Sequence, residues 1–289
     1  MKSIVFNPNK FHKSQIPAHV ILAPLAVFMS LPILYIINDA FKPFNELFAY
    51  PPRFFAHNPT LENFELLYML STETGIPLAR YLGNSLMAAI IVVFLSVFLS
   101  SVTAFSISKL NFKGKRTYFE INTYALMFVP VAVAIPRFFM LVQMGIYNSF
   151  SAHIVPLLAM PVGLFLVKQF MDQIPDELIE AARIDGATNF QVYFKVMLPL
   201  TKSALVTVAF LAFQTSWMNT EASNIFMDIE ALRTLPFYLS TLSQSSGNVV
   251  AARGVSAVGW LILFLPNLLI FLFLQSKVME SMAQSGIKS

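Results

Sequence analysis

Long apolar runs constrain this chain more than any other feature of its sequence. A bilayer core about 30 Å thick is crossed by roughly 20 mostly apolar helical residues. Six segments meet or approach that length with almost no charge: about Val20–Asn38, Asn84–Ile107, Tyr118–Val142, Ala152–Val167, Ser203–Met218 and Gly254–Ser276. The sequence therefore predicts an all-α fold, a polytopic membrane helix bundle with six transmembrane helices.

The composition agrees with a membrane protein rather than a soluble domain. Of the 289 residues, 56% are hydrophobic and 12% are charged, whereas about 25% of a typical globular protein is charged. The absence of cysteine excludes disulfides and thiolate metal sites. The net charge of +4 comes without a face rich in lysine and arginine, so we expect no nucleic-acid partner.

The distribution of basic residues predicts the orientation of the chain in the membrane. Both ends of the chain and the connections on their side of the predicted bundle hold 13 of the 19 lysines and arginines, and the opposite connections hold five. The remaining one, Arg137, lies within a predicted span. Because cytoplasmic segments carry the excess of basic residues, both termini are expected to be cytoplasmic.

This orientation divides the chain into four parts. Residues 1–19 are a cytoplasmic segment, 20–80 the first helix with a long outer loop, 81–276 a core of five helices, and 277–289 a cytoplasmic tail. The outer loop is rich in Phe, Tyr and Pro, which predicts an aromatic belt at the membrane surface, with a docking surface for an outside partner as the alternative. Within this loop, Leu61–Leu70 predicts a short amphipathic helix on the outer surface.

The connection between the fourth and fifth spans, Lys168–Lys202, carries the strongest local signals in the chain. Pro175 followed by Asp176 and Glu177 is typical of a helix start, and Gly186 is typical of the position just after a helix end. A first short helix is therefore predicted between these residues.

A second short helix is predicted to follow after a tight glycine turn. Thr188 and Gln191 have the spacing of a capping box at its start. At its far end stands Leu198-Pro199, where proline is expected to end the helix and change the direction of the chain.

The first of these helices has two possible interpretations. Ala181 and Ala182 keep it slim enough for another surface to approach closely, and Leu178, Ala182 and Asp185 are predicted to share one face. The helix pair is then either a rigid knob that transmits motion into the membrane or an ordinary amphipathic connection.

The residues of this connection also resemble a known motif. Glu180-Ala181-Ala182 is followed after three residues by Gly186, after nine more by Val196, and after one more by Leu198-Pro199. This pattern resembles the EAA loop of ABC-importer permeases, EAA-x3-G-x9-I-x-LP, with valine in place of isoleucine as the one departure.

The resemblance extends from about Leu82 to the end of the chain and points to the carbohydrate branch, the permeases similar to the maltose-type G subunit. The segments that carry it are Tyr81–Ser85, Ile135–Pro136, Met144–Ser149, Phe165–Phe170 and Gly286–Lys288. Two regions depart from the pattern. Met218–Ala252 aligns poorly beyond Trp217–Asn219 and Thr234–Pro236, and the tail has Ser289 where glycine is commoner. The first 80 residues contribute topology alone.

The resemblance implies roles for the loop, residues 171–200. In this family the EAA helix is the coupling helix, which sits in a groove of a separate cytoplasmic ATPase. The coupling residues implied here are Glu180, Ala181, Ala182, Arg183, Asp185, Gly186, Leu198 and Pro199. The tail residues Gly286, Ile287 and Lys288 are an implied second contact with the ATPases.

The resemblance also implies partners in a bacterial or archaeal cytoplasmic membrane. They are a second, non-identical permease subunit, two cytoplasmic ATPase subunits, an extracytoplasmic solute-binding protein and a saccharide substrate. The chain has no G-x-x-x-x-G-K-[ST] segment, since Gly114-Lys115-Arg116 lacks the upstream glycine and the following Ser or Thr. We therefore expect no enzymatic activity and no cofactor in this chain, with ATP and magnesium bound by the partner ATPases.

Few other residues suggest a functional site. Gln214, Trp217 and Asn219 are candidates for the substrate path, although Trp217 also suits an interfacial anchor. Arg137, near the outer end of its span, is expected to reach the headgroups or form a structural pair, with substrate contact as the alternative. The four histidines are scattered without metal-ligand spacing, so no metal site is expected.

Other functional classes fit the sequence less well. An ion-driven carrier would show buried acidic residues or histidine within its spans and usually inverted repeats, but the spans hold essentially no acid apart from Glu120, at an edge, and contain no such repeat. A membrane enzyme would need a clustered nucleophile, base or metal set. Within the family, a permease for amino acids or peptides, or an exporter, stays open as an alternative to a sugar importer.

Overall fold

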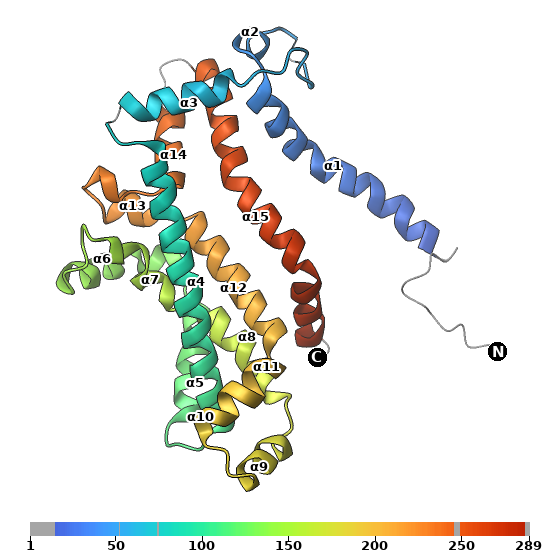
Figure 1. The fold of residues 1–289 in the computed structure, drawn as a ribbon, viewed down its shortest axis with the longest axis vertical. Helices are drawn as coiled ribbons and strands as arrows, with labels where there is room; N and C mark the ends of the chain where they lie inside the picture. The colour runs from blue at the N-terminus through green and yellow to red at the C-terminus, as the bar shows by residue number, and fades with distance from the viewer. Residues whose placement is uncertain (1–14, 52, 74, 246–248, 287–289) are drawn as a thin grey trace. The chain divides into compact units, whose positions relative to one another are not determined.

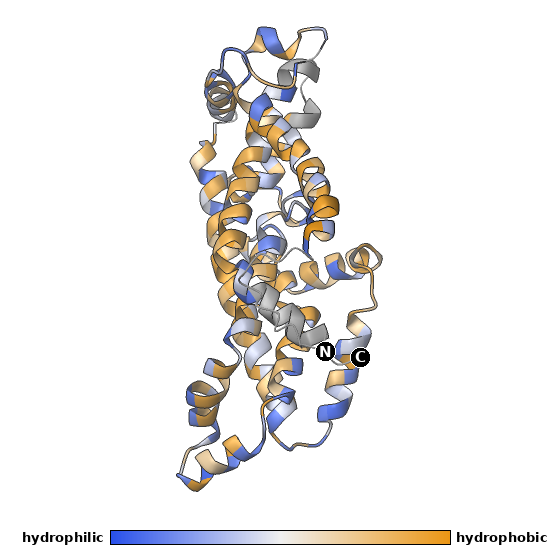
Figure 2. Ribbon diagram, turned by 90° about the vertical axis from the view of Figure 1, so that its right-hand side faces the viewer, coloured by the Kyte–Doolittle hydropathy of each residue, from blue (hydrophilic) through white to orange (hydrophobic). Residues whose placement is uncertain are grey.

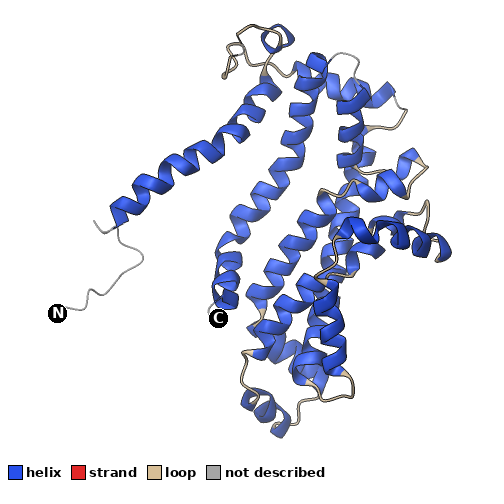
Figure 3. Ribbon diagram, turned by 180° about the vertical axis from the view of Figure 1, so that it is seen from behind, coloured by secondary structure: helices blue, strands red, loops and turns tan. Residues whose placement is uncertain are grey.

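The fold is helical throughout the part of the chain that the structure describes. The structure is a computed structural model that describes residues 15–51, 53–73, 75–245 and 249–286. These residues form helices joined by turns and loops, without a strand among them (Figure 3), so the predicted all-α class is confirmed. The contacts divide the chain into two compact units: Met1–Leu67 with Ser246–Leu261, and Tyr68–Ser245 with Ile262–Ser289.

Three of the predicted spans are continuous helices. Among the described residues, those long and apolar enough to cross a membrane are α1 (Ile16–Phe41), α4 (Leu78–Lys109) and the Arg253–Lys277 part of α15 (Val249–Gly286) (Figure 1). Hydrophobic residues dominate these helices along most of their length (Figure 2). Pro266 lies inside α15 without ending it, as expected for a membrane helix whose neighbours satisfy the freed backbone groups.

The third predicted span is interrupted, which corrects the expectation of one helix over Tyr118–Val142. The segment is divided into α5 (Lys115–Ala125), a 3-10 turn η2 (Pro130–Val133) and α6 (Ala134–Gln143). Pro130 is the physical reason. A proline drives the preceding residue out of the helical region, and Val129 has φ −74° and ψ 129°.

The fourth predicted span is bent, whereas the fifth, Ser203–Met218, is one continuous helix that meets the segment before it at a bend. Phe150–Leu158, which contains η3 (Phe150–His153) and α7 (Val155–Leu158), meets α8 (Pro161–Asp172) at an angle of 41°. Asn189–Leu200 meets Lys202–Ile225, which contains α12 (Lys202–Trp217), at 80°. The described residues thus hold three candidate spans, or up to five if each bent pair crosses as one.

The first unit is held together by a buried polar cluster at the end of α1. Asp39 forms ion pairs with Lys42 (2.6 Å) and Arg253 (3.1 Å). Asn63, in α3 (Glu62–Glu73), donates through its amide nitrogen to the carbonyls of Ala40 (3.1 Å) and Lys42 (2.8 Å). These bonds satisfy the last carbonyls of α1, which its own helix leaves open. The predicted amphipathic helix Leu61–Leu70 corresponds to α3.

The second unit is built on α4, which packs against α8 and α12. A side chain at Gly163 of α8 would sit 3.0 Å from Ser100 of α4 and 3.1 Å from Val208 of α12. The three helices therefore approach closely where their residues are small, as is usual between helices in membranes. This packing fixes the frame from which the 171–200 loop projects.

The N-terminal end of α4 is hydrogen-bonded to the segment between α12 and α15. Asn84 donates to the carbonyls of Ala231 (2.9 Å) and Arg233 (2.8 Å), and Tyr81 donates to Glu230 (2.9 Å). Ser85 accepts the backbone N–H of Leu235 (2.9 Å). These contacts explain the Tyr81–Ser85 pattern in physical terms, and they anchor η5 (Glu230–Leu232) and the start of α14 (Leu235–Ser245). The adjoining helix is α13 (Glu221–Ile225).

Candidate functional site: the 171–200 loop

The start of the loop is fixed to the end of α4 by a lysine. The Lys109 ammonium, which is almost fully buried, donates to the carbonyl of Ile174 (2.6 Å) and to the carboxylate of Asp176 (2.7 Å). The hydrogen bond and charge of Lys109 lower the pKa of Asp176. Helix α9 (Glu177–Ile184) begins just after this contact, within one residue of the predicted start. Sequence reasoning counted Lys109 only as a positive charge.

The end of α9 explains why the motif fixes Ala182 and Gly186 four residues apart. Gly186 has φ +84°, a left-handed conformation that costs glycine little. Its N–H donates to the carbonyl of Arg183 (3.0 Å), and the N–H of Ala187 donates to the carbonyl of Ala182 (2.9 Å). These two bonds are the Schellman arrangement that closes a helix. The predicted glycine turn is confirmed.

The predicted capping box at the start of α10 (Asn189–Val192) is also confirmed. The N–H of Gln191 donates to the hydroxyl of Thr188 (3.3 Å), and the N–H of Thr188 donates to the side-chain carbonyl of Gln191 (2.8 Å). Arg183 of α9 donates to the side chain of Asn189 (3.1 Å). The two short helices are therefore joined both through the backbone and through side chains.

The second helix does not end at Pro199, which corrects the prediction. A π-helical turn, η4 (Tyr193–Met197), leads into α11 (Leu198–Leu200), and the bend follows at Thr201. The N–H of Leu198 donates to Tyr193 five residues earlier, which widens the turn before the proline. A proline ring clashes with the carbonyl four residues before it in a regular helix, so the wider turn lets the helix continue through Pro199.

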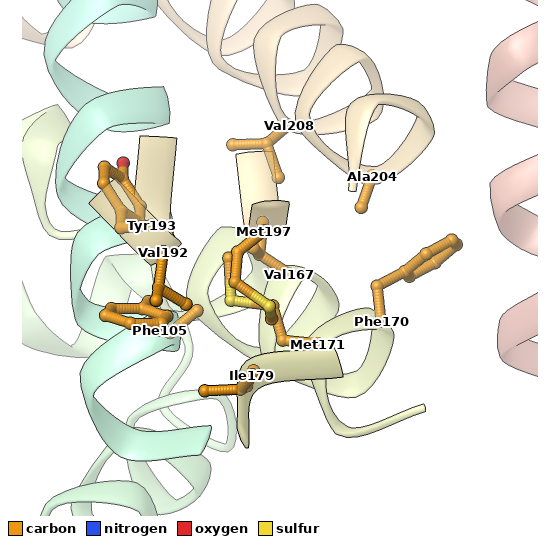
Figure 4. Close-up of a cluster of buried hydrophobic side chains, with 11 residues drawn as sticks. Phe105, Val167, Phe170, Met171, Ile179, Val192, Tyr193, Met197, Ala204 and Val208 are labelled. Carbon is orange, nitrogen blue, oxygen red and sulfur yellow. The ribbon is translucent and has the colours of Figure 1, made fainter. Parts of the chain in front are cut away.

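The loop is packed onto three helices of the second unit by a hydrophobic cluster (Figure 4). Its fully or nearly buried members are Ala104, Phe105, Val167, Phe170, Met171, Ile179, Val192, Tyr193, Met197, Ala204 and Val208. Tyr193 also shares a hydrogen bond of 2.7 Å with Ser101 of α4. Burying one such aliphatic side chain contributes about 1.5–3 kcal/mol. The loop therefore belongs to the same packed body as α4, α8 and α12.

The opposite face of α9 is open. Ile179 is 4% exposed and points into the cluster, whereas Ile184 is 86% exposed. Glu177, Glu180 and Ala181 are also exposed, so a protruding isoleucine is surrounded by acids and a small residue. Ile184 is thus the most exposed large apolar side chain of α9.

The predicted shared face of α9 is only partly reproduced. Leu178 and Asp185 are exposed, whereas Ala182 is half-buried and packs with the hydrophobic cluster. The sequence did not single out Ile184, because a helix of eight residues is too short for periodicity to fix which apolar residue faces outward.

The three residues predicted for the substrate path do not come together around a common space. Trp217 is 1% exposed, stacks on Phe213 and donates its indole N–H to the carbonyl of Leu263 (3.0 Å). Asn219 accepts the N–H of Ala222 (3.0 Å) beside α13. Gln214 alone is exposed. The structure thus places Trp217 in the packed interior and Asn219 in a turn.

Two further predicted features are located by the structure. Arg137 of α6 pairs with Glu221 of α13 at 2.7 Å, as the structural-pairing interpretation expects. Of the tail residues, Gly286 is the last residue of α15, and Ile287 and Lys288 lie outside the described residues. Within the described residues, no group of three His, Asp or Glu side chains is arranged to hold a metal ion.

The fold and the loop define a class of protein: a helical membrane protein with several candidate spans and a two-helix loop packed onto α4, α8 and α12. The family described as "Binding-protein-dependent transport system inner membrane component" matches residues 97–276, more than half of the 289 residues. The chain belongs to this family and is a permease subunit of a binding-protein-dependent ABC importer.

Individual relatives agree over nearly the whole chain. The arabinooligosaccharides transport system permease protein AraQ of Halalkalibacterium halodurans is 30% identical over 269 residues, which cover 92% of this chain and 93% of the relative. Among solved structures, a bacterial ABC transporter involved in the import of the acidic polysaccharide alginate has a chain with a TM-score of 0.75 at 18% identity, covering 92% of this chain and 98% of that one.

A second solved structure, a bacterial alginate ABC transporter in complex with an alginate pentasaccharide-bound periplasmic protein, has a chain with a TM-score of 0.60 at 14% identity. The match covers 91% of this chain and 93% of that one. Both solved structures support the permease fold.

Proposed function

We propose that this chain forms half of the membrane pathway of an ATP-driven saccharide importer and is coupled to a separate ATPase through α9. The observation that carries the proposal is the contrast between the two faces of α9. One face is packed into the cluster shared with α4, α8 and α12, and the other presents Ile184 and its acidic neighbours.

This arrangement suits the transmission of force from a cytoplasmic partner. A partner that binds Ile184 and Ala181 and moves would carry α9 with it, because Ile179 and the bonds of Lys109 attach α9 to the ends of the spans. The motion would be concentrated at the 80° bend near Thr201, where the loop joins α12. Coupling between remote sites requires such an element with two alternative arrangements.

The proposed assembly contains a second, non-identical permease subunit, two ATPases that bind ATP and magnesium, and an extracytoplasmic solute-binding protein. The binding protein follows from the family description, and the alginate transporter was solved with such a partner. Both termini and the 171–200 loop are placed in the cytoplasm, on the side rich in basic residues. The tail residues Gly286–Lys288 are proposed as a second ATPase contact, and Gln214, being exposed, stays a candidate for the substrate path.

A saccharide is proposed as the substrate class. The relative from Halalkalibacterium halodurans is named for arabinooligosaccharides, and the solved transporter imports alginate. These substrates differ in charge, so what they share is a chain of hydroxyl-bearing rings. The resemblance of the chain to the carbohydrate branch points to the same class.

Affinity purification of the chain from its native membrane tests the proposal. We expect a second permease and an ATPase with a G-x-x-x-x-G-K-[ST] segment to be recovered with it. The variant Ile184→Asp should lose the ATPase while retaining the second permease, whereas Ile184→Leu should keep both, because it preserves an apolar side chain. Recovery of the chain without any ATPase, even after crosslinking, would refute the coupling role of α9.

A further inference from the structure

A groove in the second unit contains polar groups of a kind that spans usually lack. It lies between α4, α5 and the break before α8, and has a volume of about 740 Å³. Thr103 of α4 and Tyr118 and Asn122 of α5 line it, together with the broken backbone at Ala159–Pro161. Thr103 is six residues from the end of α4, or about 9 Å along the helix axis, so the groove opens in the half of the span nearest the 171–200 loop.

Three side-chain oxygens of this groove, those of Thr103, Tyr118 and Asn122, have no partner among the described hydrogen bonds. In a helix, Ser and Thr usually donate to a carbonyl three or four residues earlier, and Ser106, Thr123 and Thr207 do so here. The described hydrogen bonds include none from the hydroxyl of Thr103 or Tyr118. Asn122 donates its amide N–H to the carbonyl of Pro161 (3.1 Å), which leaves its side-chain carbonyl oxygen available as an acceptor.

The backbone beside these residues is irregular. Ala159 has ψ 88° and Met160 has φ −113° and ψ 81°, which separates α7 from α8. Irregular backbone at membrane depth is tolerated where it is buried in protein or lines a water-filled cavity. Here the break lines the groove. The free hydroxyls and the helix break therefore meet at one place.

A second groove of the same unit provides an internal contrast. It has a volume of about 910 Å³ and lies between α4, α12 and α15. Phe94, Phe98, Phe210 and Phe213 contribute to a lining that is almost entirely apolar. Such a surface suits lipid chains or another helix, whereas the groove that contains Thr103 offers donors and acceptors to a polar solute. One helix, α4, thus presents chemically different surfaces on its two sides.

We propose that the groove between α4 and α5 is where this chain contacts the transported saccharide, through the hydroxyls of Thr103 and Tyr118 and the amide oxygen of Asn122. The inference rests on the proposed function and assigns its substrate path. Sugar hydroxyls both donate and accept hydrogen bonds and so match these three side chains, while Lys113, which also lines the groove, adds a further donor. The exposed ring of Tyr118 adds a flat apolar surface for a sugar ring. This site replaces Trp217 and Asn219, whose side chains are occupied elsewhere.

Single cysteines test the proposal directly, because the chain has none of its own. The variants Thr103→Cys and Asn122→Cys, with Phe94→Cys in the apolar groove as the matched control, are prepared in the complete transporter in inside-out vesicles. A membrane-impermeant maleimide should label positions 103 and 122 several-fold faster than position 94. Whichever of arabinotriose, maltotriose and galactotriose is taken up by intact cells that carry the transporter should then slow labelling at 103 and 122 but not at 94.

Two results would overturn the site. Labelling at 103 and 122 no faster than at 94 would show that the groove is dry or covered by the second permease. Labelling unchanged by a trisaccharide that cells with the same transporter take up would show that the path lies elsewhere, with the proposed function intact. If no saccharide drives ATP-dependent uptake, the proposed function fails instead, and the assignment of a sugar to this groove fails with it.

Transport kinetics separate a contact with substrate from a structural role. Thr103→Val keeps the shape of the side chain and removes the hydroxyl, so we expect a higher KM for uptake with the same amount of assembled ATPase. Thr103→Ser restores the hydroxyl and should restore the KM. An unchanged KM in Thr103→Val and in Asn122→Leu would contradict the proposal.

Discussion

The 171–200 loop and the groove between α4 and α5 differ in how their function is encoded. The loop is specified by local signals: a glycine at φ +84°, a capping box and a proline, each acting within a few residues. The groove is specified by tertiary structure, since Thr103, Asn122 and the break at Ala159–Met160 meet only after folding. The comparison teaches that a contact surface for another protein can be specified by residues close together in the sequence. A path for a solute instead depends on which face each long helix turns toward its neighbours.

The largest effect is expected from Gly186→Val, which places a β-branched side chain at the left-handed turn that ends α9. A left-handed conformation costs a non-glycine residue about 1–2 kcal/mol, and a β-branched side chain costs more. The Schellman turn should open, and both the bound ATPase and ATP-dependent uptake should be lost. These are measured by copurification and by uptake in vesicles.

Gly83→Ala is the matched control for this variant. Gly83 lies inside α4, where an added methyl group would meet nothing within 4 Å. Alanine should therefore stabilise the helix by about 0.5–1 kcal/mol and leave coupling intact. Equal loss of ATPase in both glycine variants would show that the left-handed turn is not what matters.

A smaller effect is expected from Lys109→Met, which frees the start of the loop from α4. The variant loses the bonds to Ile174 and Asp176, and hydrogen bonds to a charged group contribute about 1.5–3 kcal/mol. ATP hydrolysis should become less dependent on the binding protein, because α9 would move without α4. Lys109→Arg should retain most of the coupling, and wild-type behaviour of Lys109→Met would show that this attachment is dispensable.

The same attachment has a defined pH dependence. Lys109 lowers the pKa of Asp176, so the ion pair contributes stability at and above the ordinary carboxyl range and loses it as the pH falls below that range. Thermal unfolding of the solubilised transporter should be less acid-sensitive in Asp176→Asn than in the wild type over this low-pH window. Equal acid sensitivity would mean that other carboxylates dominate.

The next largest effect is expected from a variant of Trp217, which distinguishes a role in packing from a role in substrate transport. Trp217→Phe removes one of the donors to the Leu263 carbonyl, which also accepts from the side chain of Asn267, so the variant loses one hydrogen bond, a cost of about 0.5–1.5 kcal/mol. We expect a lower unfolding temperature of the solubilised transporter and an unchanged KM for uptake. A raised KM for uptake with an unchanged unfolding temperature would instead support a contact between Trp217 and the substrate.

The smallest effect is expected from Pro199→Ala. Alanine supplies the N–H that proline lacks, so the π-helical turn before it can tighten into an α-helical one. Uptake should change by less than about tenfold, equivalent to under roughly 1.4 kcal/mol. A complete loss of coupling would show that the wide turn itself is required for transmission.

The sequence predicted the loop far better than it predicted the spans. The glycine turn at Gly186 and the capping box of Thr188 were predictable because both depend on neighbouring residues alone. The interruption at Pro130 was not predicted, because prolines also lie in continuous membrane helices such as α1 and α15. Whether a proline breaks a span depends on what surrounds it.

The site residues likewise differ in whether their contacts are local in sequence or depend on tertiary structure. The partner of Trp217, Leu263, belongs to another helix and could not be predicted from spacing. Asn219 accepts the N–H of Ala222 three residues later, a local turn contact that its residue type and spacing could have indicated. Ile184 was overlooked because its outward direction is set by the burial of Ile179 in the tertiary cluster. Which face of such a short helix points outward can be determined only from the packed structure.

The most direct test of the account is crosslinking from α9 in the assembled transporter. Because the chain lacks cysteine, Ile184→Cys and Ile179→Cys can each carry a short thiol-reactive photocrosslinker at a single position. The account predicts that position 184 captures an ATPase polypeptide and that position 179, buried on the opposite face, captures none. Capture of the ATPase from position 179 but not from 184, or from neither, would contradict the coupling role of this loop.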